Sequence, residues 1–197
     1  MPMIEAFLPK HKTAFEGKRV YLPCDNPEWS NFFRFFVDRF NDWKIKELVT
    51  TFYESDPCAP VYATRIKTAV RGGSYADLVA MPGNEQIPLA NGDYLGPETA
   101  SYFDEADVIV TNPPFATSSD YIRRTIDSGK QFFIIGTLLQ ATTKRFIQDV
   151  ATGRMTCEPC KGHTFLRPDG SRADVALPAW FSSFPKVAAK RIKPTKS

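Results

Sequence analysis

The sequence predicts an α/β fold in which helices pack on a mostly parallel sheet. Between residues 18 and 150, runs of β-branched and aromatic residues alternate with segments whose apolar residues recur at helical spacing. This alternation is typical of βαβ units, in which a helix carries the chain back so that neighbouring strands run parallel. The 197 residues are enough for one domain with a substantial core.

The strands are expected where apolar runs end at polar or proline-containing turns. The predicted strands, of which the third is a hairpin arm, lie at 18–24, 46–53, 61–70, 107–111 and 130–138. The stretch 74–92 is rich in loop-forming residues and is predicted to be a loop.

The helices are expected at 25–43, 96–106, 118–128 and 141–153. The first of them carries large apolar residues at helical spacing, which predicts one broad face buried in the core. These residues are Trp29, Phe32, Phe33, Phe36, Phe40 and Trp43. Asp25 or Asn26 is expected to cap this helix, and Pro27 suits its first turn.

The composition predicts no membrane-spanning helix and indicates an intracellular protein. There is no run of about 18 apolar residues, and the first residues lack the apolar stretch of a signal peptide. Four cysteines in a chain of this length do not resemble a disulfide framework. The net charge of +3 is too small for a globally basic, histone-like protein. We therefore expect a cytoplasmic location and no membrane partner.

The end of the strand at 107–111 is the most informative stretch, because the strand runs into Asn112-Pro113-Pro114-Phe115. Adjacent prolines cannot continue a hydrogen-bonded ladder, since neither has an N–H group to donate. They fix an extended turn beyond the carboxyl end of the strand, which is where ligands bind in parallel sheets.

The chemistry of this turn suits a planar heterocycle that carries an exocyclic amino group. The Asn112 side chain and the Pro113 carbonyl supply two acceptors for the two amino hydrogens, and Phe115 supplies a flat surface for the ring. An amino group held in this way turns its lone pair toward an electrophile, so that positioning replaces a strong base. A base inside duplex DNA reaches such a turn only by flipping out of the stack.

Longer stretches around this turn resemble the EcoRI-type adenine-specific DNA methyltransferase family over roughly residues 15–185. The resemblance rests on "FEGKRVYLPCDNPEWSNFFRFF", "ELVTTFYE", "NGDYLGPETASYFDEADVIVTNPPF", "KQFFIIG" and "PAWFSSF", in this order. It implies a Rossmann-like fold, S-adenosylmethionine as the cofactor, and duplex DNA as the substrate. The implied reaction moves a methyl group to the 6-amino group of a flipped adenine.

The resemblance also implies roles for individual residues. Asn112 and Pro113 hold the target amino group, Pro114 shapes the turn, and Phe115 stacks on the base. The segment after the first strand faces the methionine half of the cofactor, with its ammonium group at Asp25. Tyr53 or Glu54 then holds the ribose hydroxyls, while Asp93 and Tyr94 contact the cofactor's adenine. The positions implied for cofactor binding are Pro23, Cys24, Asp25, Asn26, Tyr53, Glu54, Asp93, Tyr94 and Asn112.

Three regions are expected within this framework. Residues 1–153 form the methyltransferase catalytic core, 154–185 form a small β-rich extension of the same domain, and 186–197 form a basic tail. The tail can contact phosphates or serve only as a solvent-exposed end. Cys157, Cys160 and His163 have zinc-ligand spacing but lack a fourth ligand nearby, so no metal site is predicted. His11, the other histidine, is expected at the surface.

Two other functions fit the same residues. One is methylation of adenine in RNA, and the other is a catalytically weak, methyltransferase-like protein that binds nucleic acid or opposes restriction. The chain leaves little room for a separate target-recognition domain, so loose sequence specificity, a homodimer or a partner subunit is expected. The biological setting that the resemblance implies is restriction–modification or self-protection of a phage inside a bacterial host.

Overall fold

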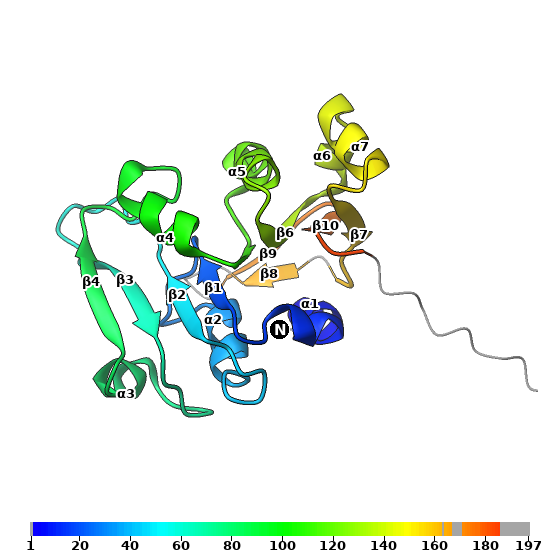
Figure 1. The fold of residues 1–197 in the computed structure, drawn as a ribbon. Helices are drawn as coiled ribbons and strands as arrows, with labels where there is room; N and C mark the ends of the chain where they lie inside the picture. The colour runs from blue at the N-terminus through cyan, green and yellow to red at the C-terminus, as the bar shows by residue number, and fades with distance from the viewer. Residues whose placement is uncertain (1, 163, 167–170, 186–197) are drawn as a thin grey trace, which may run out of the picture.

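An eight-stranded sheet runs through the protein in the order β4-β3-β2-β1-β5-β6-β10-β7 (Figure 1). The structure, a computed structural model, describes residues 2–162, 164–166 and 171–185. The strands of the large sheet are β1 (Arg19–Leu22), β2 (Glu47–Thr50), β3 (Val61–Ile66), β4 (Glu85–Leu89), β5 (Val108–Thr111), β6 (Gln131–Thr137), β7 (Thr156–Pro159) and β10 (Pro178–Ser182). A separate two-stranded sheet pairs β8 (Thr164–Leu166) with β9 (Arg172–Asp174).

The centre of the large sheet is parallel, which confirms the predicted α/β class. Strand β1 pairs in parallel with β2 and β5, and β5 pairs in parallel with β6. Strand β3 is antiparallel to β2, and β4 is antiparallel to β3, so β4 again runs in the direction of β1. The carboxyl ends of β1, β2, β4 and β5 therefore lie along one edge of the sheet.

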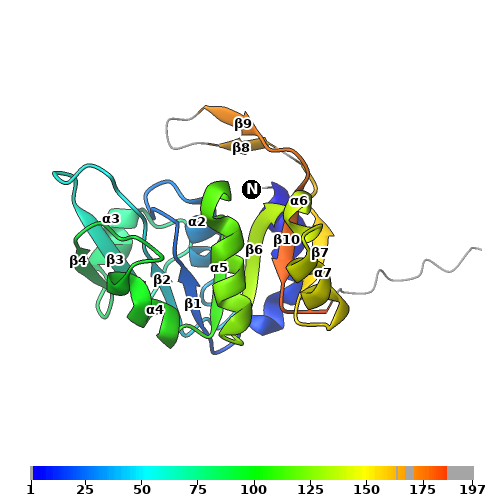
Figure 2. The same ribbon diagram turned by 90° about the horizontal axis from the view of Figure 1, so that it is seen from above.

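The helices cover both faces of the sheet (Figures 1 and 2). They are α1 (Pro2–Phe7), η1 (Leu8–Ala14), α2 (Asn31–Val37), α3 (Tyr75–Ala80), η2 (Pro97–Thr99), α4 (Ala100–Glu105), α5 (Phe115–Asp127), α6 (Leu138–Ala141) and α7 (Lys144–Ala151). Alternate strand residues enter two separate cores, since Val108 packs with α1 and α2 while Ile109 packs with α4 and α5. Within the described residues, no helix is both long enough and apolar enough to cross a membrane.

The stretch 74–92 contains α3 and β4, so the prediction of a loop is wrong. Strand β4 is an edge strand whose five residues are exposed or only partly buried. Pro88 is tolerated because an edge strand has a side that needs no hydrogen bonds. An edge strand of this kind lacks the apolar run that marks a central strand, which explains why the sequence pattern did not reveal it.

Helix α2 is shorter than the predicted helix at 25–43, and its cap is Ser30 rather than Asp25 or Asn26. The Ser30 hydroxyl accepts from the Phe33 amide at 3.1 Å and donates to Asp25 Oδ1 at 2.5 Å. Asn26 Oδ1 accepts from the Glu28 amide at 3.0 Å, which makes a turn where the helix was expected. As a result Trp29 is 42% exposed, whereas the other predicted members of the apolar face are buried.

Aromatic side chains fill much of the core beneath α1 and α2. The Phe7 and Trp180 rings stack with centroids 4.7 Å apart, and Phe133 and Phe184 stack at 4.8 Å. His11 is buried among these rings rather than exposed at the surface, which corrects the expectation. Burial lowers the pKa of His11, so the neutral imidazole suits this apolar site.

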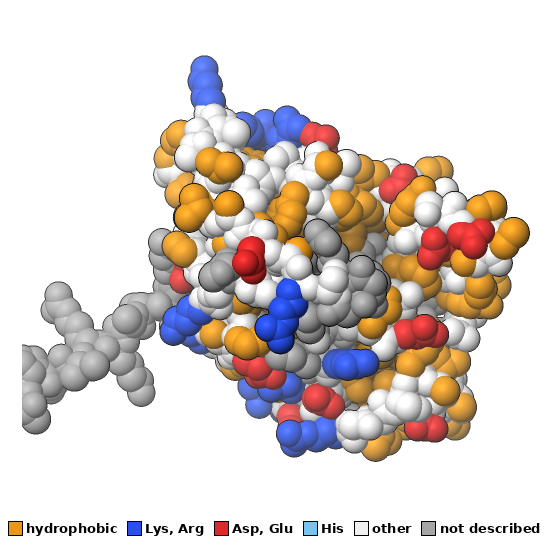
Figure 3. All heavy atoms as spheres, turned by 180° about the vertical axis from the view of Figure 1, so that it is seen from behind, with side chains coloured by type: hydrophobic (Ala, Val, Ile, Leu, Met, Phe, Trp, Pro, Cys, Tyr) orange, Lys and Arg blue, Asp and Glu red, His pale blue; other side chains and the backbone are white. Residues whose placement is uncertain are grey.

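Residues 154–185 contribute β7 and β10 to the large sheet and β8 and β9 to the small one. His163, residues 167–170 and the basic tail at 186–197 lie outside the described residues. On the face shown in Figure 3, acidic and basic side chains are distributed among hydrophobic ones, in agreement with the small net charge of +3.

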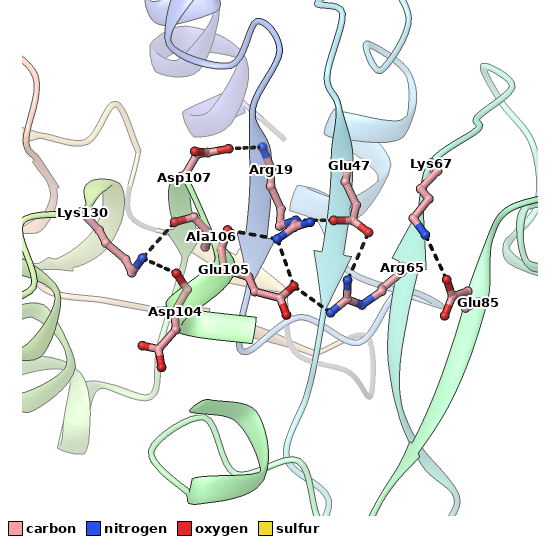
Figure 4. Close-up of polar contacts among 10 residues, drawn as sticks. All are labelled: Arg19, Glu47, Arg65, Lys67, Glu85, Asp104, Glu105, Ala106, Asp107 and Lys130. Atoms are coloured by element: carbon pink, nitrogen blue, oxygen red, sulfur yellow. Dashed lines mark hydrogen bonds and ion pairs between the residues drawn. The ribbon is translucent and has the colours of Figure 1, made fainter. Parts of the chain in front are cut away.

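Ion pairs join β1, β2 and β3 to α4 at the edge where β1 and β2 begin (Figure 4). The side chain of Glu47 is 2% exposed and pairs with both Arg19 and Arg65. Glu105, at the end of α4, also accepts from Arg19 at 2.9 Å and from Arg65 at 3.0 Å. This network holds the sheet edge that lies opposite the carboxyl ends of β1 and β2.

The Glu47→Gln variant is expected to lower the free energy of unfolding by about 3 kcal/mol, because it removes the buried one of the two carboxylates that Arg19 and Arg65 share. The matched control is Glu105→Gln, whose carboxylate is 42% exposed. The control should cost less than about 1 kcal/mol. Urea unfolding at pH 7 measures both variants, and equal losses would contradict a special role for the buried carboxylate.

Candidate functional site

A cavity of about 440 Å³ lies at the carboxyl edge of the sheet. This volume is in the range of sites that bind small molecules. Its walls come from the segments that follow β1, β2, β4 and β5. The lining residues are Cys24, Asn26, Trp29, Phe52, Tyr53, Glu54, Tyr94, Asn112, Pro113, Pro114 and Phe115.

Most of the residues predicted for the site therefore meet in one cavity. Pro23, Asp25 and Asp93 are the predicted residues that do not line it. Trp29 and Phe52 line it although they were not predicted as site residues. Trp29 was assigned to the core because it shares the helical spacing of the phenylalanines that follow it.

Asn112 presents an acceptor that the protein itself does not use. Its Oδ1 atom is buried and has no hydrogen-bond partner among the described residues. A buried acceptor without a partner costs about 1–3 kcal/mol, so this atom is suited to a ligand that brings a donor. Pro113 beside it is buried, and α5 begins immediately after the two prolines. The strand end and the helix start thus fix the amide from both sides.

Phe115 is the first residue of α5 and remains 38% exposed. Its ring meets Phe165 of β8 edge to face, with centroids 6.2 Å apart. Figure 2 shows the β8–β9 hairpin beside the first turn of α5. The contact holds the Phe115 ring in place while leaving part of it open to the cavity.

The segment after β1 is held against the end of β2. The Asp25 amide donates to the Thr51 carbonyl at 2.9 Å, and the Thr50 hydroxyl donates to the Asp25 carbonyl. The Asp25 side chain is 7% exposed, and its Oδ2 atom has no partner among the described residues. Burial raises the pKa of this carboxyl to about 7. Burial, aided by the nearby Asp25, also raises the pKa of the Cys24 thiol.

The loop after β4 is organised by Glu98, which sequence reasoning missed. Its carboxylate accepts from the backbone amides of Ala90, Asn91 and Gly92. Partial burial raises the pKa of Glu98, but these three amides hold it below its usual value overall. An acidic residue in the first turn of a predicted helix is usually explained by its favourable interaction with the helix dipole. The sequence alone therefore did not indicate that Glu98 binds the amides of the β4 loop instead.

Asp93 and Tyr94 are placed by the same loop. Asp93 Oδ1 accepts from the Leu95 amide at 2.9 Å and so forms a turn beside the cavity. The Tyr94 hydroxyl bonds to the Thr117 hydroxyl, and its ring meets Tyr121 at 5.0 Å. Tyr94 thus connects the β4 loop to α5.

On the β2 side, Tyr53 is 58% exposed. Glu54 Oε1 accepts from the amides of Ser55 and Asp56 at 2.8 and 3.0 Å. The Glu54 amide donates to the Asn91 carbonyl at 3.1 Å, which joins the β2 and β4 loops. This side of the cavity is therefore built from two loops that support each other.

Gly92 permits a close approach between these two loops. Its φ is +66°, and a Cβ atom at this position would lie 2.1 Å from the Phe52 carbonyl oxygen. Gly92→Ala is expected to cost at least about 2 kcal/mol more than Gly129→Ala, because only the first substitution adds a clash with backbone. Gly129 is the matched control, since its φ is +71° and its Cβ would meet nothing within 4 Å. Thermal or urea unfolding of both variants gives the difference, and similar losses would show that the loops separate without cost.

Comparison with known proteins agrees with this arrangement. Residues 1–154 match the family described as adenine-specific methyltransferase EcoRI. The chain is 28% identical over 149 residues to the type II methyltransferase M.EcoRI of Escherichia coli, which covers 72% of this chain and 44% of that protein. It is 31% identical over 129 residues to the type II methyltransferase M.MpnI of Mycoplasma pneumoniae, covering 64% of this chain and 35% of that protein.

A further relative is the type II methyltransferase M.MgeORF184P of Mycoplasma genitalium, at 27% identity over 136 residues, 68% of this chain and 38% of that protein. The chain thus spans less than half the length of these three relatives. No solved structure matches the chain. The family match covers most of the sequence and includes every segment that lines the cavity. The chain belongs to the adenine-specific EcoRI methyltransferase family.

Proposed function

We propose that the protein transfers a methyl group from S-adenosylmethionine to the 6-amino group of adenine in DNA. The observation that carries this proposal is the buried, unpaired Oδ1 atom of Asn112 on the wall of the cavity. An exocyclic amino group is a donor that satisfies this acceptor, and membership of the adenine-specific family favours adenine as its bearer. The fold is then a Rossmann-like methyltransferase fold.

The turn at Asn112–Phe115 acts on the target adenine by positioning it. Asn112 Oδ1 and the Pro113 carbonyl accept the two amino hydrogens, while Phe115 stacks on the flipped base. The nitrogen lone pair then points into the cavity, and the two acceptors stabilise the positive charge that develops on nitrogen. Pro114 keeps the turn rigid, and the surplus proton passes from the amino group to solvent.

The rest of the cavity is assigned to S-adenosylmethionine, which would supply a methyl group on a cationic sulfur. Asp25 does not line the cavity but lies between Cys24 and Asn26, which do, and its buried carboxylate with an unpaired oxygen favours a cationic ligand beside this segment and Pro23. Tyr53 and Glu54, which line the cavity, hold the ribose hydroxyls. Tyr94 of the cavity wall, with Asp93 in the turn beside it, contacts the cofactor's adenine.

The test is transfer of labelled methyl from S-adenosylmethionine to unmethylated duplex DNA, followed by nucleoside analysis of the product. Single-stranded DNA and single-stranded RNA are assayed beside it. Label in 6-methyladenine from DNA is the expected result. Label in RNA alone would overturn the choice of substrate. Absence of label from all three, in a protein that still binds S-adenosylhomocysteine, would overturn the activity of the chain by itself and direct the assay to a second copy or a partner subunit.

The proposed setting is restriction–modification in the cytoplasm of a bacterial cell. All three relatives are described as type II methyltransferases, which favours this setting.

A further inference from the structure

Trp29 is a large aromatic residue that is not buried in the core. It is 42% exposed and lines the cavity together with Phe115. The two other tryptophans, Trp43 and Trp180, are 6% and 1% exposed. Within the described residues, the Trp29 indole has neither an aromatic partner nor a side-chain hydrogen bond, whereas Trp43 and Trp180 pack against several rings. An exposed indole at a cavity wall, with no aromatic or hydrogen-bonding partner, is suited to contact with a ligand.

The backbone around Trp29 places the indole there. The Trp29 amide donates to the Asn26 carbonyl at 3.3 Å, and Ser30 caps α2 one residue later. Trp29 therefore belongs to the turn between β1 and α2 rather than to the helix. Since β1 and β5 are neighbours in the sheet, this turn lies next to the Asn112–Phe115 turn.

Two planar groups meet in the proposed reaction, the adenine of the cofactor and the bases of the nucleic acid. The walls assigned to the cofactor come from the β2 and β4 loops, where Tyr53 is 58% and Tyr94 is 7% exposed, so exposure alone does not separate the two sides of the cavity. Trp29 and Phe115 follow the neighbouring strands β1 and β5, line the same cavity and have similar exposure. Under the proposed function Phe115 meets the target adenine, and Trp29 is the aromatic residue on the adjoining turn.

We propose that Trp29 is a nucleic-acid-binding residue that stacks on the base beside the target adenine. This inference rests on the proposed function. When the target base leaves the stack, a face of its neighbour is uncovered, and an indole can cover that face. Stacking of this kind tolerates any base, because every base has a flat face. Trp29 thus adds affinity for the strand without reading its sequence.

Tryptophan fluorescence tests the inference directly, since Trp29 is the tryptophan that solvent reaches. An adenine-containing oligonucleotide is expected to quench the emission of the unmodified protein, and this quenching should disappear in Trp29→Phe. Trp29→Ala is expected to weaken oligonucleotide binding about tenfold by fluorescence anisotropy. Trp29→Phe should keep most of the affinity, because it keeps an aromatic face. S-adenosylhomocysteine should bind all three proteins equally.

Leu139→Ala serves as the control, because Leu139 is 65% exposed but does not line the cavity. It should bind both ligands as the unmodified protein does. Loss of S-adenosylhomocysteine binding in Trp29→Ala, with unchanged oligonucleotide affinity, would overturn the inference and assign Trp29 to the cofactor. Unchanged affinity for both ligands would overturn it as well.

The methyl-transfer assay separates this inference from the proposed function. Methyl transfer to DNA with an unchanged KM in Trp29→Ala would overturn the role of Trp29 and leave the proposed function standing. Oligonucleotide binding that depends on Trp29, in a protein that transfers no methyl group, would support the inference and overturn the function.

Discussion

Replacing Asn112 with alanine is expected to lower kcat for methyl transfer by about 10²- to 10³-fold, the usual effect of removing one preorganised hydrogen-bonding group. The amide oxygen is buried, has no partner among the described residues, and is held between β5 and α5. Alanine leaves the turn in place but removes the acceptor that we propose for the target amino group. Initial rates with labelled S-adenosylmethionine and a saturating oligonucleotide measure the effect.

Asn112→Asp is the matched variant, because it keeps an acceptor at the same position. We expect it to retain more activity than Asn112→Ala. The affinity of both variants for S-adenosylhomocysteine should change less than tenfold, since the remaining cofactor walls are untouched. If the alanine variant kept its kcat, the unpaired oxygen would have no part in the reaction.

The Asp25→Asn variant is expected to be more stable than the unmodified protein at pH 8, by on the order of 4 kcal/mol, and equally stable near pH 4. Burial raises the pKa of this carboxyl from 3.8 to about 7 in the folded protein. At pH values between these two pKa values, Asp25 stays protonated in the folded protein but is deprotonated in the unfolded chain. Stability therefore falls as pH rises through this window, and above about pH 7 the buried carboxylate is charged. Asparagine has no charge to bury and keeps an oxygen for the Ser30 hydroxyl.

Urea unfolding of both proteins at several pH values, without ligand, gives the difference as a function of pH. Asp104→Asn on α4 is the control for the removal of an exposed carboxylate. A difference that stayed constant with pH would contradict the assignment. The proposed cofactor role predicts the opposite ranking when ligand is present. At pH 8, S-adenosylmethionine should raise the melting temperature of the unmodified protein more than that of Asp25→Asn, since only the carboxylate pairs with the ammonium group.

The strands around the site were predictable because strong local signals mark them. Val108–Thr111 is an apolar, β-branched run, and the two prolines after it permit no other element. Strand ends of parallel neighbours meet at one edge by geometry, so Cys24, Glu54 and Asn112 could be expected to lie near one another before the structure was known.

Features that depend on competition between nearby groups were not predictable in the same way. Asn26 and Ser30 are both good helix caps, and only the folded chain shows that Ser30 takes this role. Because Ser30 caps α2, Trp29 lies before the helix and lines the cavity, whereas the predicted longer helix would have buried it in the core. The burial of His11 was not predictable either, because it depends on contacts with residues that are distant in the sequence. The rings of Phe133 and Phe184 pack against His11, and no residue near it in the sequence indicates this.

The pairing of β1 with β5 has a consequence for the order of events during synthesis. Val20 of β1 pairs with Val108 of β5, so β1 cannot form this pairing until almost ninety further residues have been synthesised. Parallel contacts between such distant segments form slowly, because a long loop must close before they are made. A nascent chain that ends before β5 holds the β1, β2 and β4 loops but lacks the wall that carries Asn112. The cavity is therefore completed late, and ligand binding reports that the centre of the sheet has closed.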